Sequence, residues 1–261
     1  MRQFLLTIMM LVFVGQSNAA VIGKEVSYRE GDTVLKGYLA WDDSIKGKRP
    51  GVLVVHEWWG HNAYARKRAR MLAAEGYTAL AVDMYGDGKT ADHPDTAGKF
   101  YGMVMGNMPM MKARFLAAEK NLKAHSTVDS SKTAAIGYCF GGAVVLNMAR
   151  TGHNIDAVAS FHGSLSAKIP AKKGGIKTEI LVLNGEADPF VKPEAISQFK
   201  QEMEAVGANY RFINYPGAKH SFTNPDADKF GKKFNLPLAY NAEVDKQSWQ
   251  EMLELFDKVF K

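Results

Sequence analysis

The chain has 261 residues, 46% hydrophobic and 23% charged, which is enough apolar material for a sizeable core in one domain. The formal net charge of +6 is modest, and its one local concentration is Arg66-Lys67-Arg68 with Arg70. We interpret that run as the solvated face of a helix, because no basic stretch interleaved with aromatic residues accompanies it. Nucleic acid is therefore not an expected partner.

Residues 1–19 have the pattern of a secretory signal peptide. Arg2 supplies a positive start, residues 4–14 are apolar, and Ser17-Asn18-Ala19 forms a small-x-small cleavage site. The apolar stretch is shorter than the roughly 20 residues that span a bilayer. We expect residues 20–261 to form the mature domain, secreted or periplasmic in a Gram-negative source, without stable membrane insertion.

The first half of the mature chain predicts edge strands followed by buried ones. Alternating patterns at residues 25–29 and 34–41 indicate an antiparallel pair, and continuous apolar runs at 51–55 and 78–82 indicate central strands. Asn62 can cap a helix that lies between those two runs and ends near Ala74. Residues 87–127 make a longer excursion with a helix at 110–123, and the methionines at 103–111 indicate either a lid or core filler.

The second half alternates strands with helix-like segments. Strands are predicted at residues 133–136, 157–161, 180–184 and 210–215, and the last long helix at 240–260. This alternation predicts one α/β domain, with a mostly parallel, doubly wound sheet that has helices on both faces. In such a sheet the active site lies beyond the carboxyl ends of the strands.

The strand at 133–136 leads into Gly137-Tyr138-Cys139-Phe140-Gly141-Gly142, which precedes a helix-like stretch. Strand, sharp turn and helix are the setting of the α/β-hydrolase nucleophile elbow, G-x-S-x-G, here with sulfur in place of the hydroxyl oxygen. Gly137 and Gly141 are expected to relieve the crowding around a strained nucleophile. The alternative is a small buried cysteine beside an ordinary glycine-rich turn.

A base and an acid follow the nucleophile in the order of the α/β-hydrolase triad. Asp188 comes after the strand at 180–184 and His220 after the strand at 210–215. Glu186 is a competing acid, and Asp188 alone could simply form a turn before Pro189. The conjunction of three residue types at three strand ends favours the catalytic interpretation.

Two backbone donors and a carboxylate complete the predicted site. The oxyanion hole would use the N–H groups of Phe140 and Trp58. Glu57 would lie near Cys139, where its negative charge would hold the resting thiol protonated. Trp59, Tyr85, Tyr138 and Phe222 suggest an aromatic substrate pocket, with core packing as the alternative.

His56, Glu57 and His61 lack the spacing of a zinc helix, so neither a metal nor another cofactor is implied.

Five segments together resemble the dienelactone hydrolase family over nearly the whole mature chain. They are His56-Glu57-Trp58-Trp59-Gly60, Asp83-Met84-Tyr85-Gly86, Gly137-Tyr138-Cys139-Phe140-Gly141-Gly142, Gly185-Glu186-Ala187-Asp188 and His220-Ser221-Phe222. The resemblance implies a triad of Cys139, Asp188 and His220, with Glu57 hydrogen-bonded to the resting thiol. It also implies two arginines that engage the substrate carboxylate and the glutamate, but Asp87 and Asn224 stand at the corresponding positions.

These features predict a cysteine hydrolase of small esters or lactones that works through an acyl-cysteine intermediate, as a monomer or homodimer. Two other functions stay open. One is a ligand-binding or thiol-redox protein on the same fold, although the chain has no second cysteine with which to resolve a disulfide. The other is a structural domain with a degenerate site.

Overall fold

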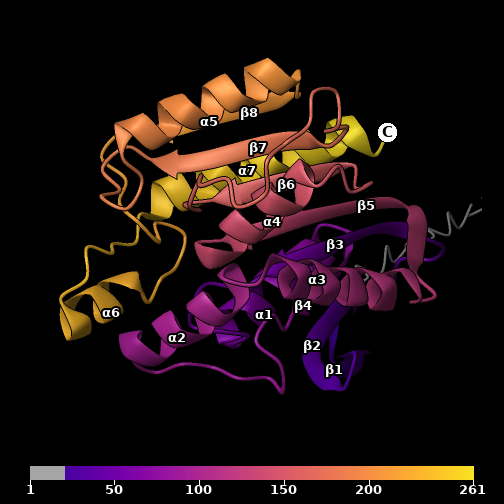
Figure 1. The fold of residues 1–261 in the computed structure, drawn as a ribbon. Coiled ribbons are helices and arrows are strands. Elements are labelled where there is room, and N and C mark those ends of the chain that lie inside the picture. Colours follow the sequence, from indigo (N-terminus) through magenta and orange to yellow (C-terminus); the bar gives the residue numbers. More distant parts are fainter. Residues whose placement is uncertain (1–20) are drawn as a thin grey trace, which may run out of the picture.

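The computed structural model describes residues 21–261, so the signal peptide predicted over residues 1–19 lies outside the described residues (Figure 1). The strands are β1 (Val21–Glu30), β2 (Thr33–Asp42), β3 (Arg49–Val55), β4 (Thr78–Val82), β5 (Val128–Tyr138), β6 (Ala157–Phe161), β7 (Glu179–Gly185) and β8 (Tyr210–Tyr215). The helices are α1 (Ala63–Ala74), α2 (Pro94–Met105), α3 (Met108–Lys123), α4 (Phe140–Arg150), α5 (Pro193–Val206), α6 (Ala227–Phe234) and α7 (Ala242–Val259).

The strands of residues 21–261 form one sheet in the order β1-β2-β4-β3-β5-β6-β7-β8. β1 pairs with β2, and β2 with β4, in antiparallel fashion, whereas all the remaining neighbours are parallel. β4 and β6 are buried along their whole length because both faces of the sheet are covered there, whereas the edge strand β8 keeps exposed positions. The predicted α/β fold with a mostly parallel sheet is confirmed.

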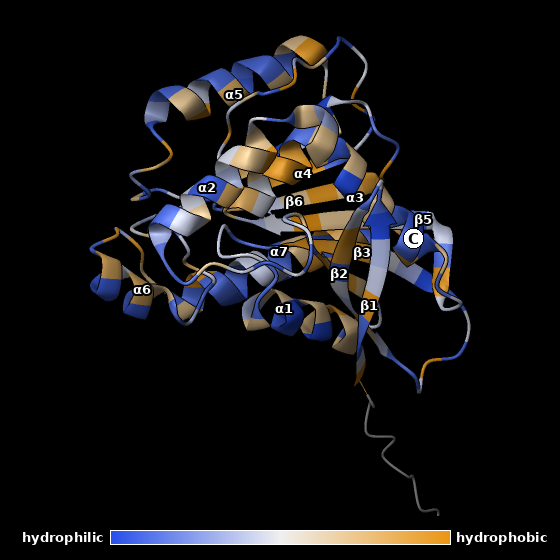
Figure 2. Ribbon diagram, turned by 60° about the horizontal axis from the view of Figure 1, so that its bottom comes forward, coloured by the Kyte–Doolittle hydropathy of each residue, from blue (hydrophilic) through white to orange (hydrophobic). Residues whose placement is uncertain are grey.

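Helices cover both faces of the sheet, and each face has its own apolar core. α3 and α4 pack on one face through side chains such as Phe115 and Val144, and α1 and α7 pack on the other through Leu72 and Phe256. Figure 2 shows the hydrophobic strands between these two layers. Each such fully buried side chain stabilises the fold by about 1.5–3 kcal/mol relative to an exposed one.

Local signals place most helix ends. Asn62 caps α1 as predicted, since its side chain accepts hydrogen bonds from the N–H groups of Tyr64 and Ala65. The methionine-rich segment at 103–111 joins the last turn of α2 to the first turn of α3, with Met105 and Met111 buried. Those two methionines therefore fill the core.

Within residues 21–261, no helix is both long and apolar enough to cross a membrane.

Candidate active site

Cys139 lies at the sharp turn between β5 and α4, at the carboxyl end of the sheet. Its backbone has φ 53° and ψ −110°, a conformation that L-residues rarely adopt and that costs of order 1–3 kcal/mol. A Cβ atom on Gly137 would lie 2.1 Å from the Gly141 carbonyl oxygen, and one on Gly141 would lie 2.2 Å from the Val55 carbonyl oxygen. The steric need for both glycines is confirmed.

His220 and Asp188 are joined by a hydrogen bond. His220 Nδ1 lies 2.7 Å from Asp188 Oδ2, and the other Asp188 oxygen accepts from the Phe190 N–H at 2.8 Å. The Asp188 side chain is fully buried, whereas Glu186 is exposed. The structure therefore selects Asp188 over Glu186 as the partner of the histidine.

The electrostatic surroundings of His220 favour its protonated form. Burial alone would lower the pKa of His220, but the neighbouring Cys139 sulfur and the hydrogen bond to Asp188 raise it to about 10. The ring of Phe190 stands edge-on to His220, with 5.0 Å between ring centroids. His220 is thus held between a carboxylate and the sulfur, as a base in a triad must be.

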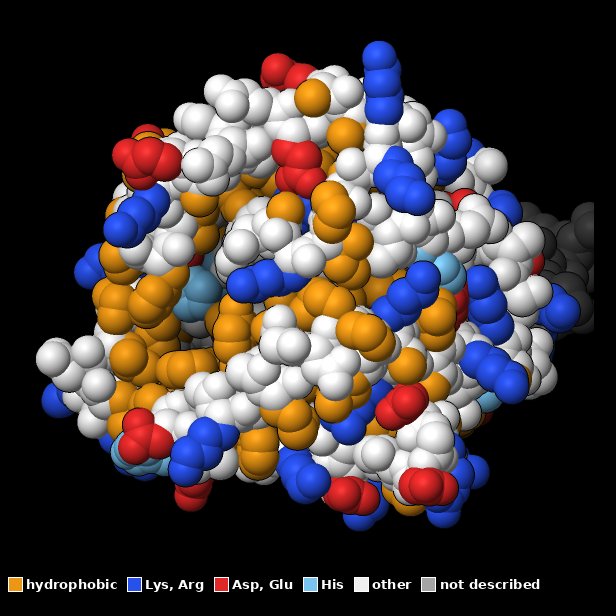
Figure 3. Space-filling model, in the orientation of Figure 1, with side chains coloured by type: hydrophobic (Ala, Val, Ile, Leu, Met, Phe, Trp, Pro, Cys, Tyr) orange, Lys and Arg blue, Asp and Glu red, His pale blue; other side chains and the backbone are white. Residues whose placement is uncertain are grey.

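Cys139 and His220 both face a cavity of about 340 Å³. It is lined by Trp58, Gly98, Tyr101, Cys139, Phe140, Ser164, Phe190, Val191, His220, Leu236 and Leu238. Figure 3 shows a hollow rimmed by hydrophobic side chains at the left of the view, with a histidine visible in it. None of the lining residues is Lys, Arg, Asp or Glu, so the cavity walls are mainly apolar.

The predicted oxyanion donors border the same cavity. Trp58 and Phe140 both line it, and neither backbone N–H donates a hydrogen bond to another group of residues 21–261. Phe140 is the first residue of α4, so its N–H is one of the orphan donors of a helix N-terminus. The hydroxyl of Tyr85 donates to the Trp58 carbonyl at 3.0 Å, which fixes the orientation of the peptide between Trp58 and Trp59.

Glu57 is buried after β3, but its carboxylate is engaged away from the sulfur. Oε1 accepts from the Ser221 hydroxyl at 2.9 Å, and Oε2 accepts from the Asn224 side-chain amide at 2.6 Å. Burial raises the pKa of Glu57, and these two hydrogen bonds oppose that rise. The expected hydrogen bond between Glu57 and the resting thiol is thus replaced here by bonds to the loop that carries His220.

The four aromatic residues predicted to form the substrate pocket lie in the core instead. Trp59, Tyr85, Tyr138 and Phe222 are at most 2% exposed, and none of them lines the cavity. Their rings pack beneath the loops. Trp59 stacks on Phe230, and Tyr138 stacks on Phe161. Tyr85 meets His56 edge-on and Phe140 at a tilt, and Phe222 meets Tyr215 and His162 edge-on. That part of the prediction is wrong, because a position near a strand end does not decide which way a side chain points.

Residues that the sequence did not single out form the cavity walls in their place. Tyr101 comes from α2, Phe190 from the turn after Asp188, and Leu236 and Leu238 from the segment after α6. A short bridge between His220 and Leu238 holds that last segment against the loop that carries His220. Phe190 could have been predicted to line the cavity, because it stands two residues after Asp188 in the sequence. The places of Tyr101, Leu236 and Leu238 in the cavity wall depend on long-range packing.

Residues 35–260 match the model of the dienelactone hydrolase family. The chain belongs to the dienelactone hydrolase family. It is 31% identical over 229 residues to Protein usf of Aquifex pyrophilus, a match that covers 85% of this chain and 96% of that protein. Membership supports a hydrolytic function on small substrates.

Two solved structures superpose closely on this one. The dienelactone hydrolase-like promiscuous phosphotriesterase P91 from metagenomic libraries is 37% identical, with a TM-score of 0.88. The structure titled m3DLH is 39% identical, also with a TM-score of 0.88. Each match covers 93% of this chain and 100% of the other.

The positions where the dienelactone hydrolase resemblance implies arginines are occupied differently here. Asp87 is exposed, pairs with Lys89 at 3.5 Å and does not line the cavity. Asn224 is buried and donates to Glu57, which gives that carboxylate a neutral partner. The lysines that stand near these two positions in the sequence, Lys89, Lys219 and Lys229, do not line the cavity either. A substrate carboxylate would therefore find no lysine or arginine in this cavity.

Proposed function

We propose that this member of the dienelactone hydrolase family cleaves small neutral esters or lactones through an acyl-cysteine intermediate, with Cys139, His220 and Asp188 as its triad. The observation that carries the proposal is that the strained Cys139 shares one apolar cavity with a histidine bonded to a buried aspartate. A structural or purely ligand-binding role would not need that strain at the nucleophile position.

In the first half of the reaction, the Cys139 sulfur attacks the substrate carbonyl carbon. The carbonyl electron pair moves onto oxygen, where the free N–H groups of Trp58 and Phe140 stabilise the negative charge; each such donor contributes about 3–4 kcal/mol in comparable enzymes. The intermediate then collapses. Its carbon–oxygen bond to the alcohol breaks, and the departing oxygen takes the proton from His220, which leaves an acyl-cysteine.

In the second half, water replaces the alcohol. Neutral His220 removes a proton from the water, whose oxygen attacks the thioester carbon. The carbon–sulfur bond breaks, the carboxylic acid leaves, and sulfur and histidine return to their starting charges. Asp188 holds the His220 ring in the orientation that both steps need. Glu57 holds Ser221 and Asn224, and hence the loop that carries the base.

Export from the cytoplasm is part of the proposal, because residues 1–19 carry the signal-peptide pattern. Cells that express the full chain are expected to hold the protein in the periplasmic or secreted fraction, in a form shortened near Ala20. Full-length protein in the cytoplasmic fraction would contradict export and leave the proposed chemistry unaffected.

A neutral substrate is expected to react faster than an anionic one of the same size. The cavity offers no lysine or arginine to a substrate carboxylate, and an uncompensated charge in an apolar cavity is costly. We expect kcat/KM for p-nitrophenyl butyrate to exceed that for mono-p-nitrophenyl succinate by about tenfold or more, a difference of about 1.4 kcal/mol. Dienelactone, which carries a carboxylate, is expected to be similarly poor.

The variant Leu238→Arg places a cation in the cavity wall. It is expected to reduce the ratio of kcat/KM for the neutral butyrate ester to kcat/KM for the anionic succinate ester. Equal or faster turnover of the succinate by the unmodified protein would contradict the neutral-substrate claim. It would leave the hydrolase claim in place, since both esters report on the same acyl transfer.

A further inference from the structure

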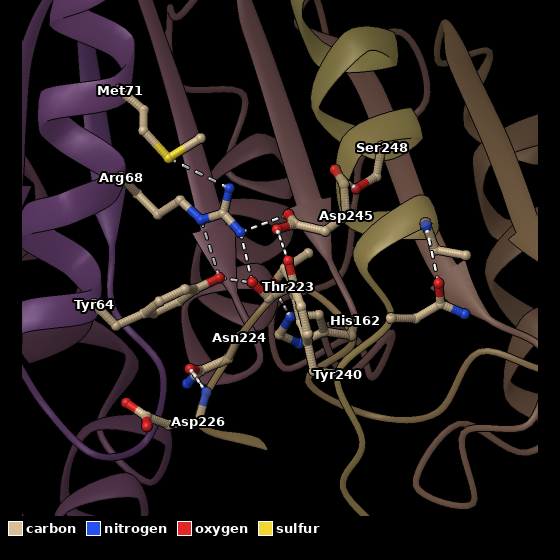
Figure 4. A network of polar contacts seen from close by, with 12 residues as sticks. Tyr64, Arg68, Met71, His162, Thr223, Asn224, Asp226, Tyr240, Asp245 and Ser248 are labelled. Carbon is tan, nitrogen blue, oxygen red and sulfur yellow. Dashed lines mark hydrogen bonds and ion pairs between the residues drawn. The ribbon is translucent and has the colours of Figure 1, made fainter. Parts of the chain in front are cut away.

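Arg68, on α1, is a buried cation beneath the loop that carries His220, so the prediction that Arg66-Lys67-Arg68 and Arg70 form a solvated helix face is wrong at this residue. It is 2% exposed, and its Nη2 donates to the Thr223 carbonyl at 2.6 Å and to Asp245 Oδ1 at 2.5 Å. Its Nε donates to the Tyr64 hydroxyl at 3.2 Å. Figure 4 shows these contacts converging from α1, α7 and the loop. A buried guanidinium needs such partners, so the three segments are held together at one side chain.

Thr223 is held through both its backbone and its side chain. While its carbonyl accepts from Arg68, its hydroxyl lies 2.6 Å from the Tyr64 hydroxyl and 2.8 Å from His162 Nε2 (Figure 4). Its neighbours Ser221 and Asn224 are the two residues that bond to Glu57. The loop that follows His220 is therefore fixed from below by Arg68 and from the side by Glu57.

The same arginine contacts the strand end that carries the nucleophile. Its guanidinium carbon lies 5.3 Å from the ring centroid of Tyr138, the residue directly before Cys139, and 5.2 Å from that of Tyr64. A cation over the face of an aromatic ring is attracted by the ring, and the more so when the pair is shielded from water. Arg68 thus bridges the segment that holds the sulfur and the segment that holds the base.

We propose that Arg68 is a positioning residue that sets the placement of His220 relative to Cys139. The inference rests on the proposed function of that pair. It also accounts for the neutral Asn224 at a position where the family resemblance implies an arginine, because α1 brings a buried cation to the same loop from the other side. The charge of Arg68 acts on Glu57 as well, whose pKa it lowers against the effect of burial.

Several titratable groups face Arg68 and the residues bonded to it. Of these groups, Tyr64 alone is substituted in one of the variants used in the test. They are Tyr64 on α1, Tyr138 at the end of β5, His162 after β6, Glu57 after β3, Tyr240 just before α7 and Asp245 in the first turn of α7.

The test compares Arg68→Met with Arg150→Met by the rate at which iodoacetamide alkylates Cys139, the one cysteine of the chain, between pH 5 and 10. Arg150 is an ideal control because it is 3% exposed, pairs with Glu202 at 2.8 Å and donates to the Leu165 carbonyl at 3.0 Å, and it contacts neither His220 nor Thr223. Both variants lose a buried arginine with a carboxylate and a carbonyl as partners.

In Arg68→Met we expect iodoacetamide to alkylate Cys139 more slowly over the pH range, because His220 no longer lies in place beside the sulfur and an adjacent imidazolium makes a cysteine more reactive. We expect kcat for a neutral ester to fall about 100-fold, with KM changed less than about threefold, as displacement of a catalytic group by about 1 Å would cause. Arg150→Met is expected to lower the melting temperature but to keep the alkylation profile and kcat of the unmodified protein.

Tyr64→Phe serves where Arg68→Met does not fold, since it keeps the ring and removes only the hydroxyl that bonds to Thr223. It is expected to shift alkylation in the same direction by a smaller amount. A folded Arg68→Met with an unchanged profile and kcat overturns the inference, and so does an unchanged Tyr64→Phe where Arg68→Met fails to fold. Alkylation needs no substrate, so absence of ester turnover in the unmodified protein would count against the hydrolase proposal alone.

Discussion

Cys139→Ala is expected to lower kcat/KM for p-nitrophenyl butyrate by about 10⁴-fold or more, a loss typical of nucleophile removal. The variant removes the sulfur that attacks the carbonyl carbon, and the chain has no second cysteine to replace it. The rate of p-nitrophenol release measures the effect directly. The melting temperature is expected to change little, because the Cys139 side chain is only partly buried.

Cys139→Ser is the matched control for the chemistry. It keeps a nucleophilic atom at the same elbow and should preserve the fold, but a hydroxyl is far less ionised than a thiol at neutral pH. We expect Cys139→Ser to keep at most about one per cent of the activity, in line with a loss of about 100-fold or more. Turnover by a folded Cys139→Ala within about tenfold of the unmodified protein would show that another group is the nucleophile.

Asp188→Asn is expected to lower kcat by about 10³–10⁴-fold, as for the orienting aspartate of other triads. The carboxylate accepts a hydrogen bond from the Nδ1–H of His220. An amide can present its NH₂ group there instead, which favours the tautomer of His220 with no proton on Nδ1. Asp188 also helps to raise the pKa of His220, so the variant should bring that pKa down. The measurement is kcat as a function of pH with a neutral ester.

Glu186→Gln provides the comparison for Asp188→Asn, because the two acids stand two residues apart on the same turn. Glu186 is exposed and has no role in the site, so its variant is expected to keep kcat within about twofold, as for most surface substitutions. A large loss in Glu186→Gln together with normal activity in Asp188→Asn would reverse the assignment of the acid.

Much of the fold could be read from local patterns. The bounds of β4, β6 and β8 agree with the predicted ranges, because each is a short strand bounded by turn residues. The elbow was recognisable because the two glycines that it needs for steric reasons, Gly137 and Gly141, stand two residues before and two residues after Cys139. The pairing of His220 with Asp188 followed from topology, since neighbouring parallel strands bring their carboxyl ends together.

The walls of the cavity could not be read in the same way. Sequence position placed Tyr138 and Phe222 near the site, but their side chains point into the core on the α1 and α7 side. Leu236 and Leu238 reach the cavity only because the segment after α6 folds back along His220. The partners of Glu57 also come from a loop more than 160 residues away, which no local pattern encodes.

The measurement that tests the central claim most directly is the intact mass of the protein after rapid acid quench during turnover of p-nitrophenyl butyrate. The proposal predicts a transient species heavier by one butyryl group, located on the peptide that contains Cys139 and absent from Cys139→Ala. Turnover without any acylated protein, or an acyl group on another residue that persists in Cys139→Ala, would contradict the acyl-cysteine route.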